Sequence, residues 1–186
     1  ARYLALVLAS LLPDEPEVWG LPALLTFAGA RASARGGTYL PLADQDPATW
    51  DAAMIAEGEA LLRRAAAAGT IGRFQLEAAI SSVHCDRART GTTDWAALTR
   101  LYRALVRLTP TLGARTALAA AVGRAEGPSA GLAVLDAIDD PAAGRFQPAW
   151  ATRAELTRDP AAYAKAISLT TDPAVRRWLT ARAERL

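Results

Sequence analysis

The sequence predicts an all-α protein, because its apolar residues recur with the 3.6-residue period of a helix and nowhere alternate for long with the period of two that is typical of strands. A second observation is the repeated placement of helix-start signals, in which an aspartate or a glycine precedes a proline. Composition supplies a third: with 52% hydrophobic and 22% charged residues, the 186-residue chain is able to bury a sizeable core. We therefore expect a single domain over residues 1–186, a stack of about eight to ten helices joined by short turns.

Residues 1–32 predict two helices. The first ends where Pro13 and Asp14 follow it, and it carries an apolar stripe at helical spacing. The stripe consists of Leu4, Leu8, Leu11 and Leu12. The second begins near Asp14, and we expect Pro22 to bend or shorten it, because proline removes a backbone N–H inside the helix. Turn-forming residues without a helical period then predict a long loop over residues 33–45.

Two longer helices are expected after this loop. Asp46 and Pro47 form a start signal. The aspartate caps the helix, and proline is tolerated at the first helical position because the backbone N–H that it lacks would have no partner there. The helix that they begin is expected over 46–68 and ends before Gly69. A further helix is expected over 72–88.

Residues 94–138 and 146–185 are also expected to be mostly helical. Asp94 caps a helix with a continuous apolar stripe, and Pro110 ends that helix. Further start signals lie at Gly127-Pro128, Asp159-Pro160 and Asp172-Pro173.

Helical hairpins in series invite a search for internal repeats, and three fragments resemble the tetratricopeptide pattern. Pro13 and Trp19 have the spacing of the link between consecutive repeats. The stretches that begin at Tyr102 and Tyr163 both look like the second half of the second repeat helix. These two tyrosines are 61 residues apart, which is not a multiple of the repeat length of about 34 residues. We therefore expect a degenerate, tetratricopeptide-like stack.

The composition excludes several kinds of site. One cysteine and one histidine exclude a disulfide scaffold, cysteine-based metal clusters and most imidazole metal sites, so we expect no metal and no cofactor. Because no apolar run reaches the roughly 18 residues that a membrane helix needs, we expect no membrane contact and a cytoplasmic protein. No nucleotide-binding, nucleophile-elbow or metalloprotease motif is present, so no catalytic residue is assigned.

Charge is distributed unevenly along the chain. Residues 1–60 contain three arginines against eight acidic residues, whereas residues 61–135 contain ten arginines against four. A basic stretch is able to bind phosphates, but its arginines lack the clustering of a dedicated nucleic-acid binder. We therefore expect no direct nucleic-acid contact.

Glu57 attracts attention because it follows Trp50 and Met54 at helical spacing, which puts a carboxylate on the apolar side of its helix. A buried acid needs partners, and His84 is one candidate donor. Two interpretations stay open: a core carboxylate that pins two helices together, or an acid that contacts a ligand or a partner. The adjacent His84 and Cys85 point about 100° apart on a helix and do not form a nucleophilic pair.

Long loops in tightly connected helical domains are where binding concentrates. We therefore expect the loop at 33–45 and the start of the following helix to line a functional groove for a protein partner or a ligand. Asp46 is expected to act only as a cap. The groove residues are Asp44, Trp50, Asp51, Glu57, Gln75, His84, Trp95 and Tyr102.

Six segments in the same order carry a resemblance to a known family. They are residues 11–20, 44–58, 74–84, 93–102, 127–136 and 153–156. The chain resembles the C-terminal extension of a group of extracytoplasmic-function RNA polymerase sigma factors, in which a helical, tetratricopeptide-like region follows two promoter-recognising sigma domains. The resemblance implies a regulatory interaction domain whose partner is another protein or the sigma domains of its own parent chain, with RNA polymerase reached only through that parent chain.

Several positions depart from the family pattern. Ala117 and Leu118 stand in place of an asparagine-arginine pair, residues 35–37 replace acids in the long loop, and the hairpin between Leu156 and Tyr163 is shortened. Because the sequence begins without methionine and lacks sigma domains, we expect it to be part of a longer chain. The alternative is a stand-alone relative that binds a small molecule in an apolar pocket between helices and catalyses a reaction on it.

Overall fold

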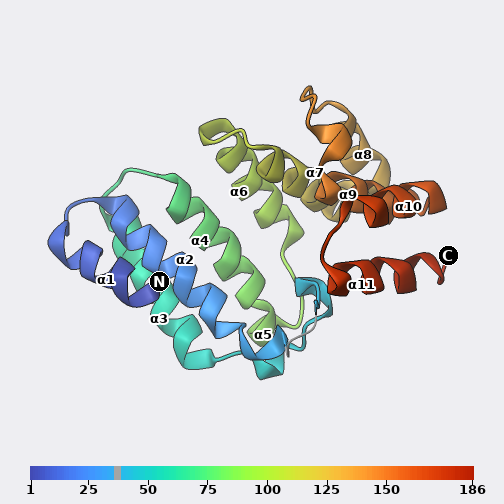
Figure 1. Ribbon diagram of the computed structural model, residues 1–186. Coiled ribbons are helices and arrows are strands. Elements are labelled where there is room, and N and C mark those ends of the chain that lie inside the picture. The colour runs from blue at the N-terminus through green and yellow to red at the C-terminus, as the bar shows by residue number, and fades with distance from the viewer. Residues whose placement is uncertain (36–38) are drawn as a thin grey trace. The chain divides into compact units, whose positions relative to one another are not determined.

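Helices account for all the regular secondary structure of the described residues, which are 1–35 and 39–186 of the computed structural model (Figure 1). Besides the four-residue helix α5, these residues form ten helices, so the predicted all-α stack is confirmed. The helices are α1 (Arg2–Leu11), α2 (Pro16–Ala30), α3 (Ala52–Ala67), α4 (Arg73–Cys85), α5 (Arg87–Thr90), α6 (Trp95–Leu108), α7 (Leu112–Glu126), α8 (Pro128–Asp136), α9 (Gln147–Thr157), α10 (Pro160–Leu169) and α11 (Pro173–Ala183). Short 3-10 turns are η1 (Ser33–Arg35), η2 (Leu42–Asp44), η3 (Pro47–Thr49) and η4 (Ala143–Arg145).

Side-chain caps and prolines begin several helices where the sequence predicts them. Asp94, Asp159 and Asp172 each accept a hydrogen bond from a backbone N–H in the first turn of α6, α10 and α11, at 2.8, 2.9 and 2.7 Å. Proline opens α8, α10 and α11. These bonds satisfy backbone donors that a helix leaves unpaired at its N-terminus.

The helix predicted from Asp46 begins later than expected. Asp46 caps only the turn η3, and the backbone is extended at Trp50 and Asp51. Asp51 caps α3 in place of Asp46, while its own N–H donates to the carbonyl oxygen of Ala30 at 2.9 Å. The prediction of one continuous helix is wrong because this bond to the end of α2 holds Asp51 outside the helical conformation.

Pro22 does not shorten α2, which continues to Ala30 with Pro22 buried inside it. The alternative expectation, a bend at Pro22, stays a prediction. The predicted leucine stripe of α1 faces away from the core: the face that packs on α2 contains the buried Ala5 and Ala9. Ala9 belongs to one buried cluster with Trp19 of α2 and Ala65 of α3, and the leucines are left on the outside of α1.

Two compact units make up the described chain. Residues 1–35 and 41–108 form the first unit, with α1–α6, and residues 39–40 and 109–186 form the second, with α7–α11. The single domain expected over 1–186 stays a prediction. Part of the predicted loop at 33–45, including two of the three departures at 35–37, lies outside the described residues.

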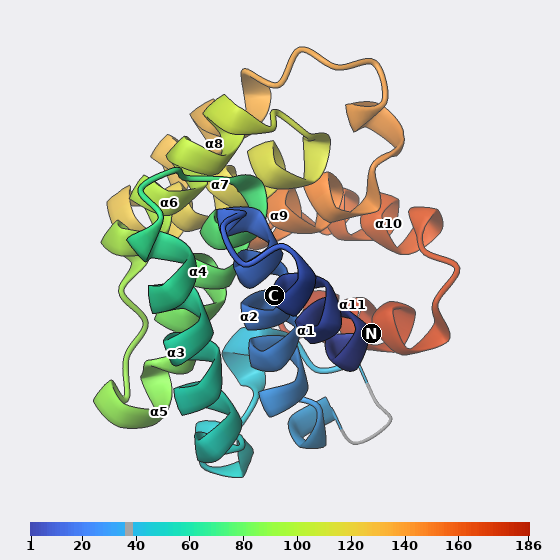
Figure 2. The same ribbon diagram turned by 90° about the vertical axis from the view of Figure 1, so that its left-hand side faces the viewer.

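Helix α2 is the centre of the first unit, where it packs against α1, α3 and α4 (Figure 2). Its Phe27 is fully buried. Gly58 of α3 lies against the Phe27 ring, and a Cβ at Gly58 would come within 3.0 Å of that ring. Gly58 therefore lets α3 pack closely against α2.

The start of α2 holds its neighbours through two polar contacts. The indole N–H of Trp19 donates to the carbonyl oxygen of Pro13 at 2.9 Å, across the turn between α1 and α2. The carboxylate of Glu17 accepts hydrogen bonds from the backbone N–H groups of Phe74 and Gln75, at 2.8 and 3.1 Å. Glu17 is thus a cap for α4 that comes from another helix, and it complements the positive end of the α4 dipole.

In the second unit, α7 and α8 pack at close range through glycine. A Cβ placed on Gly131 would lie 2.6 Å from the Cα atom of Gly123 and 2.7 Å from the carbonyl oxygen of Ala119. These neighbours are backbone atoms, which cannot rotate away as a side chain can. Only glycine at Gly131 allows this approach.

A polar network joins α9, α10 and α11. Glu155 accepts hydrogen bonds from the hydroxyl of Tyr163 at 2.6 Å and from the guanidinium of Arg182 at 2.9 and 3.0 Å. Burial alone would raise the pKa of Glu155, but these hydrogen bonds outweigh it and the pKa is lowered. Burial and the bond to Glu155 raise the pKa of Tyr163 to about 12. The network therefore holds an ionised carboxylate.

Gly131→Ala should lower the free energy of unfolding by about 1–3 kcal/mol, because the added methyl group has no room beside the α7 backbone. Gly113→Ala is the matched control: Gly113 lies in α7, and apart from its chain neighbours and its own helix backbone no atom of the described residues comes within 4 Å of the point that an added methyl group would occupy, so alanine there should be neutral or stabilising by up to about 1 kcal/mol. Urea unfolding of both variants measures the difference. Equal stabilities would contradict the close packing of α7 on α8.

Candidate functional site

Arg87 organises the loop that precedes α3. Its guanidinium donates to the backbone carbonyl oxygens of Leu42 and Gln45, at 3.0 and 2.6 Å, and to that of Ala43 at 3.1 Å. It also lies over the ring of Trp50, 5.1 Å from the ring centroid. We call this arrangement the Arg87 clamp, because one side chain fixes three loop carbonyls and an aromatic ring.

Trp50 lies beneath the clamp and is buried. Among the described residues, neither its indole N–H nor the Nε–H of Arg87 has a hydrogen-bond partner, although both are buried. The structure packs Trp50 into the core, and the sequence-based prediction that it lines a groove stays a prediction. The sequence shows that Trp50 lies beside a helix start, but it does not show that the loop held by Arg87 covers the ring.

His84 and Trp95, both of which the sequence analysis names as groove residues, contact each other. Their rings meet edge to face, with centroids 5.9 Å apart and planes at 78°, which joins α4 to the start of α6. Burial lowers the pKa of His84 from 6.5 to about 4, and the positive charges of Arg31 and Arg87 add to this effect. The imidazole is therefore neutral at pH 7.

Cys85 follows His84 but contacts a different group. Its sulfur accepts a hydrogen bond from the Arg31 guanidinium at 3.2 Å. Burial raises the pKa of the thiol more than the positive charge of Arg31 lowers it. A buried, protonated thiol is a poor nucleophile.

Glu57 does not reach His84. Both carboxylate oxygens of Glu57 lie 2.6 Å from Nη2 of Arg2, and the two side chains are each 40% exposed. The helical stripe placed Glu57 on the side of α3 that meets α1, where the chain's second residue supplies the cation. Glu57 is therefore a half-exposed ion-pair partner, and the expectation of a buried acid is wrong.

The other groove candidates are dispersed over the first unit. Gln75 is buried, and its side-chain amide donates to the carbonyl oxygen of Thr70 at 2.7 Å. This bond holds the turn between α3 and α4. Tyr102 is partly buried on α6, where burial and the negative charge of Glu77 raise its pKa. Asp44 is exposed on η2, within the loop that the clamp holds.

The structure thus brings together some of the expected residues and separates others. Trp50 and Asp44 share the clamped loop, and His84 meets Trp95; Glu57 and Gln75 each contact other groups. The sequence analysis missed Arg87 and Arg31. Arg87 connects α5 to the loop before α3, and Arg31 connects the end of α2 to Cys85 of α4. An arginine that binds backbone carbonyls has no sequence signal, because every residue carries the acceptor.

The described residues contain no group of three or more histidine, cysteine, aspartate or glutamate side chains placed to hold a metal ion. In the same part of the chain, none of the helices has the length and hydropathy that would let it cross a bilayer.

Arg87→Lys should lower the free energy of unfolding by about 1–3 kcal/mol, because an ammonium group cannot reach all three carbonyls that the guanidinium binds. Arg89→Lys is the matched control on the same short helix, since Arg89 is exposed and forms a surface ion pair with Asp86, and its effect should stay within about 0.5 kcal/mol. Chemical unfolding of both variants gives the comparison. A clamp variant as stable as its control would show that the loop is held by other contacts.

His84 should make stability depend on pH. Because its pKa is near 4 in the folded chain and 6.5 as a reference value, the unfolded chain binds a proton that the folded chain does not between these values. The free energy of unfolding should therefore fall as pH decreases from about 6.5 to about 4, and His84 should contribute no slope above or below that window. His84→Gln should remove this part of the slope in urea unfolding measured across the window. The same slope in both proteins would rule out a buried neutral imidazole.

Comparisons with known proteins give relatives without a described activity. Residues 1–66 match a family of unknown function (DUF6596). An uncharacterised protein of Rhizobium meliloti (strain 1021) is 38% identical over 146 residues, which is 77% of this chain and 34% of that protein. The chain therefore spans about a third of the length of the curated relative that it matches. No solved structure matches significantly.

Proposed function

We propose that this chain is a helical interaction module, related to the C-terminal extension of extracytoplasmic-function sigma factors, that binds the sigma domains of a parent chain and thereby controls transcription initiation. The observation that supports the proposal is an exposed apolar face on α1. Tyr3, Leu4 and Leu11 are 76%, 69% and 72% exposed. Val7, Leu8 and Leu12 extend this face and are 37–47% exposed. We call these six residues the α1 face.

The α1 face is unusual for a helix that packs on a core. Single exposed leucines are common on protein surfaces, but a contiguous apolar face marks a surface that another molecule covers. Burial of apolar area stabilises an association by about 25 cal/mol per Å² before the costs of ordering are subtracted. Five large apolar side chains on one helix, with Leu12 directly after it, therefore suit a docking surface.

The proposed occupant is a sigma domain of the same parent chain. The curated relative extends well beyond the region that this chain matches, since the match covers 34% of its length. In the sigma factors that the sequence resembles, the promoter-recognising domains precede the helical extension, so that, of the described helices, α1 would lie nearest to them along the chain. RNA polymerase and promoter DNA would then be reached through those domains, in the cytoplasm, and without direct nucleic-acid contact by this chain.

Leu4→Glu and Leu11→Glu should weaken this docking while leaving the fold intact, because both side chains already face solvent. Ile71→Glu is the matched control: Ile71 is 68% exposed and lies in the turn between α3 and α4, not on α1. We expect all three variants to keep the free energy of unfolding within about 0.5 kcal/mol. Transcription from a promoter of the parent sigma factor should fall severalfold for the two α1 variants only.

The reading frame around residue 1 and a binding assay complete the test. The upstream segment, expressed separately, should bind the wild-type chain and the Ile71 variant but not the α1 variants. A frame without sigma domains upstream, or unchanged transcription by Leu4→Glu and Leu11→Glu, would overturn the proposal.

A further inference from the structure

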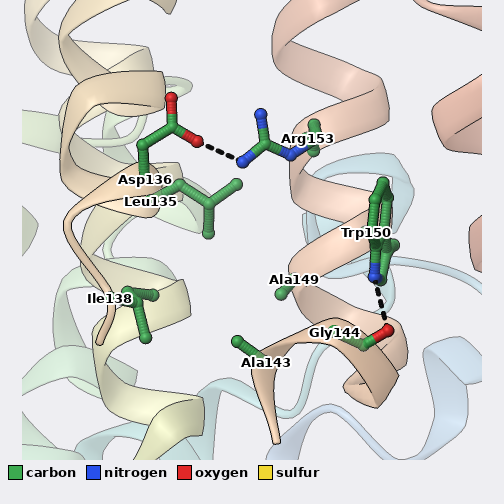
Figure 3. Close-up of a pocket in the computed structure, with 8 residues that line it drawn as sticks. All are labelled: Leu135, Asp136, Ile138, Ala143, Gly144, Ala149, Trp150 and Arg153. Atoms are coloured by element: carbon green, nitrogen blue, oxygen red, sulfur yellow. Dashed lines mark hydrogen bonds and ion pairs between the residues drawn. The ribbon is translucent and has the colours of Figure 1, made fainter. Parts of the chain in front are cut away.

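A pocket of about 320 Å³ lies in the second unit between the end of α8, the turn η4 and helix α9 (Figure 3). Its apolar wall is formed by Leu135, Ile138, Ala143 and Ala149. This volume is at the lower end of the range of about 300–1,000 Å³ that small-molecule sites occupy. The pocket is thus suited to one small ligand with a compact apolar group.

Two opposite charges lie side by side at one end of the pocket. Arg153 of α9 pairs with Asp136 at the end of α8, and Figure 3 shows the pair above the apolar wall. The Arg153 side chain is 31% exposed and that of Asp136 is 53% exposed. Within the described residues, the carboxylate of Asp136 binds through only one oxygen, and the guanidinium of Arg153 makes one hydrogen bond. Both groups therefore keep hydrogen-bonding capacity for a ligand.

Trp150 forms the remaining wall. Its indole N–H donates to the carbonyl oxygen of Gly144 at 3.1 Å, which fixes the ring against η4 (Figure 3). The Arg153 guanidinium lies 5.9 Å from the centroid of the Trp150 ring. A ring held by both contacts is a rigid surface, and a rigid aromatic wall binds an apolar group with little loss of conformational entropy.

We propose that this pocket binds a free α-amino acid with an apolar side chain. A ligand with one charge would meet one like charge in the pair, since an anion faces Asp136 and a cation faces Arg153. A zwitterion avoids this conflict: its ammonium group binds the second oxygen of Asp136, its carboxylate binds unused N–H groups of Arg153, and the charges then alternate in sign. The apolar side chain enters the space beside Leu135 and Trp150.

This inference does not rest on the proposed interaction with sigma domains. The pocket residues all belong to the second unit, whereas the α1 face belongs to the first. Failure of one proposal therefore leaves the other untouched.

Calorimetric titration with L-phenylalanine and L-leucine tests the pocket in the full chain. We expect saturable binding, with N-acetyl-L-phenylalanine and L-phenylalaninamide each at least about tenfold weaker, because each lacks one of the two charges. L-alanine should bind more weakly than L-leucine, because its side chain leaves the apolar wall uncovered. Absence of saturable binding by both probes, or equal binding of the blocked derivatives, would overturn the proposal.

Variants then locate the binding. Arg153→Gln and Asp136→Asn should each weaken L-phenylalanine binding at least about tenfold, and Ala143→Leu, which fills the pocket and keeps both charges, should abolish it. Arg73→Gln is the matched control, since it breaks an ion pair with Glu77 in the other unit. The melting temperature of each variant shows that it is folded. Undiminished binding by a folded Ala143→Leu variant would place the amino acid elsewhere and overturn the proposal.

Discussion

Close packing of α2 against its neighbours is the constraint on which the first unit depends. The helix is enclosed by α1, α3 and α4, and enclosure on several sides requires small residues at the contacts. A Cβ on Gly20 would lie 2.7 Å from the backbone nitrogen of Gln75. At this distance the Glu17 carboxylate reaches the first turn of α4. The carbonyl oxygen of Ala30, at the other end of α2, accepts the N–H of Asp51 and so sets where α3 begins.

The region around the Arg87 clamp is also positioned by the packing of α2. Arg31 comes directly after α2 and touches the sulfur of Cys85 at the end of α4. The chain then turns into α5, which carries Arg87 to the carbonyls of the loop before α3. Burial and two neighbouring cations keep His84 neutral there. These contacts are thus internal to the first unit, and the docking surface that we propose lies on α1.

The second unit relies on different contacts. Gly131 lets α7 and α8 approach to backbone distance, and the ionised Glu155 joins α9 to the next two helices through Tyr163 and Arg182. The amino-acid pocket that we propose lies where α8 ends and α9 begins. Arg153 and Asp136, which form the ion pair in this pocket, are 17 positions apart in the chain, and both side chains line the pocket.

Local signals by themselves determined the all-α class and many helix starts. A cap such as Asp159 bonds an N–H two residues away, so its effect is complete within one turn of the sequence. The tertiary structure alone decided the partner of Glu57, the outward side of the α1 leucines and the burial of Trp50. Periodicity shows that a helix has an apolar side, but the identity of the neighbour depends on residues about 55 positions away, as for Arg2 and Glu57. Arg87 was beyond any sequence pattern, because the carbonyl groups that it binds are present at every residue.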